Sequence, residues 1–237
     1  IRHSQPGINL QGSSAFLAVL IVIGLMSLAL PTVTESKPGG EASLPFSIYL
    51  IFASVVAYGV FLFVQTGRYR GWFKDVGEEA PHELGFYVRS IKVHAVLLVL
   101  YLVPIVLLAK QMATFVDAGI YSANLPPAIG GVMIALIVLS PEAMVAIRAA
   151  RHNAMQQSVN ICLGSGLATI GLTVPAVLVV SFWTGVPIEL GLEPWALVLL
   201  VMTFLLSMQT FGSSRTNYLQ GVLHLLLFGT YIVLIFD

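Results

Sequence analysis

The sequence has few charged residues and almost no cysteine. Asp, Glu, Lys and Arg together make up 9% of its 237 residues, whereas 57% are hydrophobic. Soluble globular domains carry about 25% charged residues, so this composition excludes an ordinary soluble domain. The single cysteine, Cys162, excludes an intramolecular disulfide, and cysteine usage therefore does not indicate the redox compartment.

The sequence also lacks the motifs of catalysis. It contains no HExxH, no GxSxG and no His/Cys cluster with metal-ligand spacing. We therefore expect a protein that is not an enzyme and needs no cofactor. The formal net charge is zero, and we expect no nucleic-acid partner. No cleavable signal peptide is evident, and the start at Ile1 predicts that part of the protein lies upstream.

Long apolar runs are what the sequence has instead. Several of these runs reach the roughly 20 residues that are needed to span a bilayer. We therefore expect membrane lipid to surround the protein. We predict an all-α fold, a polytopic membrane helix bundle of about seven transmembrane helices. The expected spans are about 13–31, 45–65, 91–108, 126–151, 158–182, 194–211 and 218–236. Between the third and fourth spans, 110–124 is expected to be a short polar or interfacial stretch.

The spans divide the chain into three expected parts. Residues 1–66 would form two transmembrane helices, 67–90 a cytoplasmic linker of both charges, and 91–237 a five-helix transmembrane repeat. The linker contains Glu78, Glu79 and Glu83. Such a run is either a regulatory acidic segment or, more commonly, a solvated loop.

The placement of basic residues predicts the orientation. Nine of the eleven Lys and Arg residues fall on one side of the predicted spans, and only Lys37 and Lys110 fall on the other. Because cytoplasmic loops carry the excess of Lys and Arg, we expect a cytoplasmic amino terminus and an outside carboxy terminus. The nine are Arg2, Arg68, Arg70, Lys74, Arg89, Lys92, Arg148, Arg151 and Arg215.

A carboxylate lies deep in the fourth predicted span, in the sequence Ser140-Pro141-Glu142. If Arg151 reaches the cytoplasmic interface, nine residues at ~1.5 Å rise place Glu142 about 13 Å into the membrane. A low dielectric favours the protonated form of a carboxyl group, and a nearby cation favours its ionised form. Glu142 can therefore bind either a proton or a metal ion. Pro141 leaves a carbonyl without its helical donor, and we expect that carbonyl to face an ion. The alternative is that Glu142 pairs with a buried base.

The fifth span carries helix-weakening and polar residues. Asn160, Gly164, Ser165, Gly166 and Thr169 all lie in it. Helices interrupted around a carboxylate form ion sites in secondary transporters, which predicts an ion-coupled transporter. The hydroxyl groups can instead bond their own helix, and the glycines can serve close packing.

The sequence SPEAMVAIRAARHNAMQQSVNICLGSGLATIGLTVP, from Ser140 to Pro175, resembles the second alpha-repeat of the cation/proton exchangers in the calcium/cation antiporter superfamily. It is most similar to the bacterial sodium/calcium–proton branch. The resemblance implies that Glu142, Gly164 and Ser165 belong to the cation and proton site, and that the membrane is a bacterial inner membrane. The family's Gly-Asn before the Glu falls here on Val138-Leu139, its Gln after Gly-Ser on Ala168, and the acidic or amide position before the fifth span on Gln156. FVQTGRYRGWF and RTNYLQGVLHLLLF also resemble that branch.

Two functions follow from this resemblance. The first is a secondary transporter that exchanges a cation, Ca²⁺ or Na⁺ with K⁺ as a further candidate, for protons. Glu142 would be the metal ligand and proton carrier, and Ser165, Asn160, Gly164 and Ser140 would complete the site. The second is a membrane subunit that needs a complementary chain and has no complete transport site.

The family has two inverted repeats, each giving one Glu, so this chain corresponds to the last seven of eleven spans, half of the fold. The missing amino-terminal repeat is the expected partner. The other acidic residues, Asp117 among them, are expected in loops or at span ends.

Overall fold

The computed structural model describes residues 7–34, 42–74, 90–213 and 217–237. These residues form helices and no β-strand, in agreement with the predicted all-α class. The helices are α1 (Leu10–Leu28), α2 (Leu30–Val33), α3 (Leu44–Thr66), a 3-10 helix η1 (Arg70–Phe73), α4 (Ile91–Ser122), α5 (Ala128–Arg151), α6 (Met155–Thr184), α7 (Pro194–Phe211) and α8 (Tyr218–Ile235). Seven helical segments are long and apolar enough to cross a membrane, as predicted.

Local sequence signals set several helix ends. The side chain of Asn9 accepts a hydrogen bond from the backbone N–H of Gln11 and caps α1. Pro45 and Pro194 occupy the first turns of α3 and α7, where a missing N–H costs nothing. Gly185 ends α6 in the left-handed region, with φ 71°, which a side chain would disfavour. The predicted spans therefore agree with the helices to within a few residues, except in α4.

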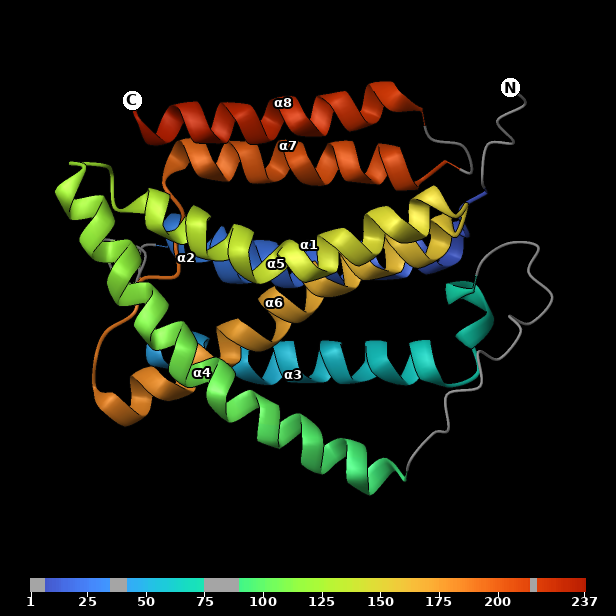
Figure 1. Ribbon diagram of the computed structural model, residues 1–237, viewed down its shortest axis with the longest axis horizontal. Helices are drawn as coiled ribbons and strands as arrows, with labels where there is room; N and C mark the ends of the chain where they lie inside the picture. The colour runs from blue at the N-terminus through green and yellow to red at the C-terminus, as the bar shows by residue number, and fades with distance from the viewer. Residues whose placement is uncertain (1–6, 35–41, 75–89, 214–216) are drawn as a thin grey trace. The chain divides into compact units, whose positions relative to one another are not determined.

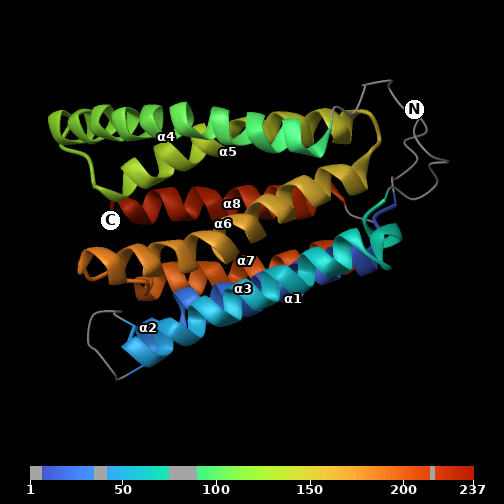
Figure 2. The ribbon, with the colours of Figure 1, turned by 90° about the horizontal axis from the view of Figure 1, so that it is seen from below.

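The chain folds as two compact units. The first holds α1, α2, α3, η1, α6, α7, the part of α5 from Glu142 and most of α8; the second holds α4, α5 up to Pro141 and the end of α8. In the first unit α1 packs against α3, α6 and α7, as can be followed in Figures 1 and 2. Three aromatic rings join α1, α3 and η1, with centroids 4.6 Å apart for Phe16 and Phe61 and 5.5 Å apart for Phe16 and Phe73.

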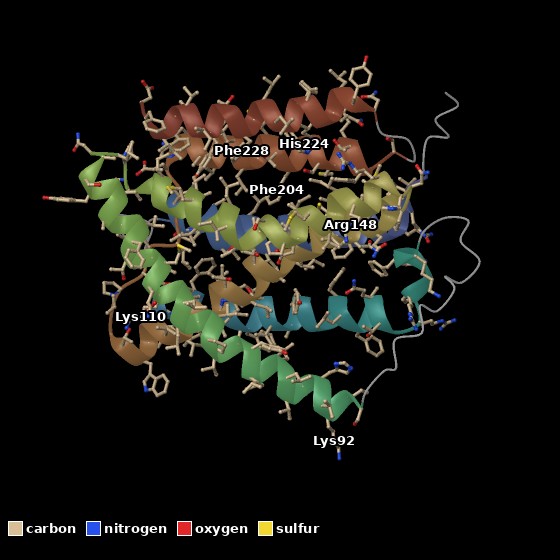
Figure 3. The ribbon with its side chains drawn as sticks, in the orientation of Figure 1. Lys92, Lys110, Arg148, Phe204, His224 and Phe228 are labelled. Atoms are coloured by element: carbon tan, nitrogen blue, oxygen red, sulfur yellow. The ribbon has the colours of Figure 1, made fainter. Side chains whose placement is uncertain are left out.

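In the second unit the helix of the third predicted span is longer than predicted. α4 continues without a break to Ser122, through Pro104, Lys110 and Asp117, so most of the expected polar or interfacial stretch 110–124 is helical; Figure 3 shows Lys92 and Lys110 on this one helix. The segment after Lys110 contains no strong helix breaker until Pro126 and Pro127, so the helix continues beyond the apolar run. Asp117, which was expected in a loop or at a span end, lies in the last two turns of α4.

Part of the predicted linker 67–90 is folded. Arg70–Phe73 form η1, which packs against α1, α3 and α6 in the first unit. Glu78, Glu79 and Glu83 lie outside the described residues, as do Arg2, Lys37, Arg89 and Arg215. The choice between a regulatory segment and a solvated loop stays open, and so does the three-part division at 66 and 90.

Candidate cation site

Glu142 sits on α5, directly after Pro141 and nine residues before the end of the helix at Arg151. Its side chain is half-buried. The Oε2 atom is buried and has no hydrogen-bond partner among the described residues. A buried carboxylate oxygen without a partner is costly, and such atoms in native proteins call for an explanation such as an ion or a proton. The Oε2 atom thus offers no support for the structural alternative of a buried ion pair.

The carbonyl released by Pro141 accepts a hydrogen bond from a side chain. A proline at position 141 removes the donor that would bond the carbonyl of Ile137. In the structure the hydroxyl of Ser140 donates to that carbonyl at 2.8 Å and replaces the missing bond. The second lone pair of the carbonyl oxygen is not used by this bond, so its contact with an ion stays a prediction. This arrangement keeps α5 continuous across Pro141.

The two long sides of α6 have different surroundings. One side is buried in the first unit and carries Val159, Leu163, Leu167 and Val174. With about 100° per residue, Ser165 lies on the opposite side, together with the exposed residues Cys162 and Thr169. The fold thus directs a row of small polar side chains away from the packed core. The hydroxyl groups of Ser165 and Thr169 in this row are therefore the ones on this side of α6 that could bind a cation.

Gly164 faces α1. A Cβ atom at this position would lie 3.4 Å from the Phe16 ring, at van der Waals contact. Gly166 and Gly171 also face side chains of the first unit, where a Cβ atom would lie 3.6 Å from Leu20 and 3.4 Å from Tyr58. Gly164 and Gly166 thus lie against neighbouring side chains, while Ser165 faces the other way.

Asn160 belongs to a chain of amide hydrogen bonds at the start of α6. Its Nδ2 donates to the carbonyl of Phe73 at 2.6 Å, and its Oδ1 accepts from Gln156 Nε2 at 2.9 Å. Gln156 is fully buried and accepts a bond of 2.7 Å from the backbone N–H of Asn9. The network connects α6 with η1 and the start of α1. The sequence prediction missed it, although two amides at i, i+4 on one helix were the available signal.

The predicted site residues are thus not joined by hydrogen bonds into one cluster. No hydrogen bond links Glu142 to Ser165 among the described residues, and Asn160 bonds with Gln156 and Phe73. The residues that the structure describes contain no group of three His, Cys, Asp or Glu able to hold a metal. Any cation here would need ligands in addition to one carboxylate, because Ca²⁺ takes about 6–8 oxygen ligands.

Comparison of the sequence with known proteins identifies a family. The model of the sodium/calcium exchanger protein family matches residues 93–236, which contain Glu142 and all of α6. Over 98% of its length the chain is 40% identical to y4hA, an inferred ionic transporter of Sinorhizobium fredii, and covers 64% of that protein. It is 32% identical to the sodium-potassium/proton antiporter ChaA of Escherichia coli, with 96% of this chain and 63% of ChaA covered.

A third relative is more distant. The Ca²⁺/H⁺ antiporter of Aphanothece halophytica is 24% identical, with 95% of this chain and 62% of the relative covered. The chain therefore spans just under two thirds of the length of each of these relatives. Their names describe a transporter of unspecified ions, an exchanger of sodium and potassium for protons, and an exchanger of calcium for protons.

Proposed function

The chain belongs to the sodium/calcium exchanger family, and on that premise we propose that it takes part in exchanging a cation for protons across a bacterial inner membrane. The observation that carries the proposal is the buried, unpartnered Oε2 atom of Glu142 on a helix apolar enough to span a membrane. A carboxylate at bilayer depth is a functional site by default. The relatives named as antiporters add support.

Glu142 would bind a proton and a cation alternately. The carboxylate accepts the proton when no cation is near, and a cation displaces the proton because the ionised form is then favoured. Exchange follows when the loaded forms, but not the empty charged form, change their access from one side to the other. Na⁺, K⁺ and Ca²⁺ are the candidate cations, since the two relatives named as antiporters carry these ions in their names.

The proposed ligands beside Glu142 are hydroxyl oxygens. Ser165 presents its side chain on the unpacked side of α6. Ser140 donates its proton to the carbonyl of Ile137, which leaves the oxygen lone pairs free to face a cation. Gly164 and Asn160 act through position: Gly164 packs on Phe16 and Asn160 holds the start of α6 against η1.

A second carboxylate has to come from elsewhere. Asp117 and Glu142 are the acidic residues in the seven candidate spans. Asp117 lies in the second compact unit, near Gly130, where a Cβ atom would be 4.0 Å from its Oδ1, and Glu142 belongs to the first unit. Asp117 is therefore not assigned to the site of Glu142. We therefore propose that a first family repeat supplies the partner carboxylate. From the placement of the basic residues we also propose that the amino terminus of this chain is cytoplasmic.

The second candidate function is a membrane subunit that needs a complementary chain and has no complete transport site of its own. Vesicles containing this chain and a chain with the first repeat test whether exchange takes place. We expect Na⁺, K⁺ or Ca²⁺, added one at a time, to drive proton movement reported by an internal pH dye. Absence of movement with all three cations, in vesicles where both chains are inserted, would refute exchange and leave the subunit role.

A further inference from the structure

Two helices of the first unit share a polar contact that the cation site does not use. His224 on α8 lies with its Nε2 atom 3.3 Å from the hydroxyl oxygen of Ser207 on α7. Its Nδ1 atom lies 2.8 Å from the carbonyl oxygen of Gln220, one helical turn earlier. Figure 3 shows His224 between α7 and α8. Both helices are candidate membrane spans, and Ser207 is buried.

The Gln220 carbonyl fixes the tautomer of the neutral ring. A carbonyl oxygen only accepts hydrogen bonds, so the short contact requires a proton on Nδ1. The Nε2 atom then carries a lone pair and accepts the hydroxyl proton of Ser207. His224 is therefore presented in one defined form, with its basic nitrogen directed toward α7.

The same two oxygen atoms also suit the protonated ring. When a proton binds the Nε2 lone pair, one N–H bond forms and the ring gains a single positive charge. The Ser207 hydroxyl rotates, so that its oxygen accepts the new N–H, and its own proton turns to the backbone carbonyl one turn earlier, the usual acceptor of a helical serine. Both N–H groups of the cation then have acceptors, and no backbone movement is needed.

Among the described residues, the helices that form and border this contact hold no fixed charge. Neither α7 nor α8 contains Asp, Glu, Lys or Arg, and α1, which packs against α7, contains none either. The contact borders an open pocket of about 310 Å³, lined among others by Thr203, Phe228 and Tyr231. Tyr231 is the one other titratable side chain in that lining. An ionisable residue inside a membrane span is costly to keep unless it functions.

We propose that His224 and Ser207 form a second proton-binding site within the membrane, separate from the carboxylate of Glu142. The ligand is the proton, bound at Nε2 of His224 and stabilised by the hydroxyl oxygen of Ser207. This proposal does not depend on cation exchange, because the site is complete in the contacts of α7 and α8.

Nuclear magnetic resonance of the chain in lipid vesicles, with ¹⁵N-labelled histidine, tests the site directly. The chain contains five histidines, and the signals lost in His224→Gln identify those of His224. We expect the neutral ring to carry its proton on Nδ1, and acidification of the vesicles to add a second proton at Nε2 while the fold is retained. A neutral ring with its proton on Nε2, or a ring that gains no second proton before the fold is lost, would overturn the proposal.

Matched variants separate the site from its surroundings. Ser207→Ala removes the oxygen that accepts the new N–H, so the Nε2 signal of the doubly protonated ring should shift. Thr203→Val changes a hydroxyl that lines the same pocket but donates to the carbonyl of Leu199 on its own helix, and it should leave that signal unchanged. Equal Nε2 signals in the Ser207→Ala variant and the unmodified chain would contradict the role of Ser207. A chain without cation exchange but with a doubly protonated His224 would separate the two proposals.

Discussion

Gln156 donates its side-chain amide to Asn160 Oδ1 at 2.9 Å, one turn further along α6. The pair connects the start of α1 to η1, because Gln156 also accepts from the backbone N–H of Asn9 and Asn160 donates to the Phe73 carbonyl. Three helices that lie far apart in the sequence thus meet at two neutral amides. In an apolar environment a buried amide without its hydrogen-bond partners destabilises the fold, so the two amides depend on each other and on their backbone partners.

Gln156→Ala should lower the thermal stability of the chain. The change leaves the Asn9 N–H and Asn160 Oδ1 without these bonds, and a buried group left unpaired costs about 1–3 kcal/mol. For a chain of this size each kcal/mol corresponds to about 2–4 °C in Tm, measured in detergent. Gln157→Ala is the control, because the neighbouring Gln157 is exposed and its loss should change Tm little. Equal Tm values for the two variants would contradict the network.

Ser140→Ala should weaken both the helix and the cation site. It removes the donor to the Ile137 carbonyl and a proposed oxygen ligand, so Tm should fall and the apparent KM for the cation should rise several-fold. Ser140→Thr keeps the hydroxyl and should keep both properties. A lower Tm with an unchanged KM would show that Ser140 only completes the helix across Pro141.

Cysteine labelling tests the orientation predicted from the basic residues. In a Cys162→Ala background, a cysteine at Glu189 should react with an impermeant reagent added to intact cells, and a cysteine at Lys74 should not. Lys74 directly follows η1 on the expected cytoplasmic side, and Glu189 lies in the connection between α6 and α7. Labelling at Lys74 with protection at Glu189 would reverse the orientation.

This chain alone should not exchange cations for protons. A divalent ion held by one carboxylate and a few hydroxyls would lack both oxygen ligands and compensating charge in a low dielectric. Vesicles containing the purified chain should therefore show no cation-driven proton flux, and addition of a chain with the first repeat should restore it. Robust flux from the chain by itself would disprove the need for a partner carboxylate.

The helices could be predicted from the sequence where hydropathy alone determines them. The runs around α3, α7 and α8 are apolar and end at Gly, Pro or charged residues, and the predicted bounds differ from the observed ones by at most one residue. The length of α4 could not be predicted that way. After Lys110 the sequence becomes more polar but contains no proline before Pro126, so hydropathy ends the predicted span earlier than the helix ends.

The sequence was sufficient to identify Glu142 as a candidate site residue, but not to predict the contacts around it. Glu142 stands out because a carboxylate in an apolar run is rare. The partners of Asn160 and Ser140 depend on the three-dimensional approach of η1 and on the exact geometry around Pro141. A mid-span amide was expected to be a ligand, because the sequence does not show that Phe73 lies within 2.6 Å of it. His224 was missed for a similar reason, since Ser207 lies on a different helix.

The most direct test of the account is the Glu142→Gln variant in vesicles that contain the first repeat as well. Glutamine keeps the size and hydrogen-bonding capacity of the side chain but cannot release a proton or carry charge. We predict that cation-driven proton flux is lost while membrane insertion and Tm are retained, and that Glu142→Asp retains partial flux because its charge is withdrawn by one methylene. Normal flux in Glu142→Gln would show that Glu142 is structural and would contradict the account.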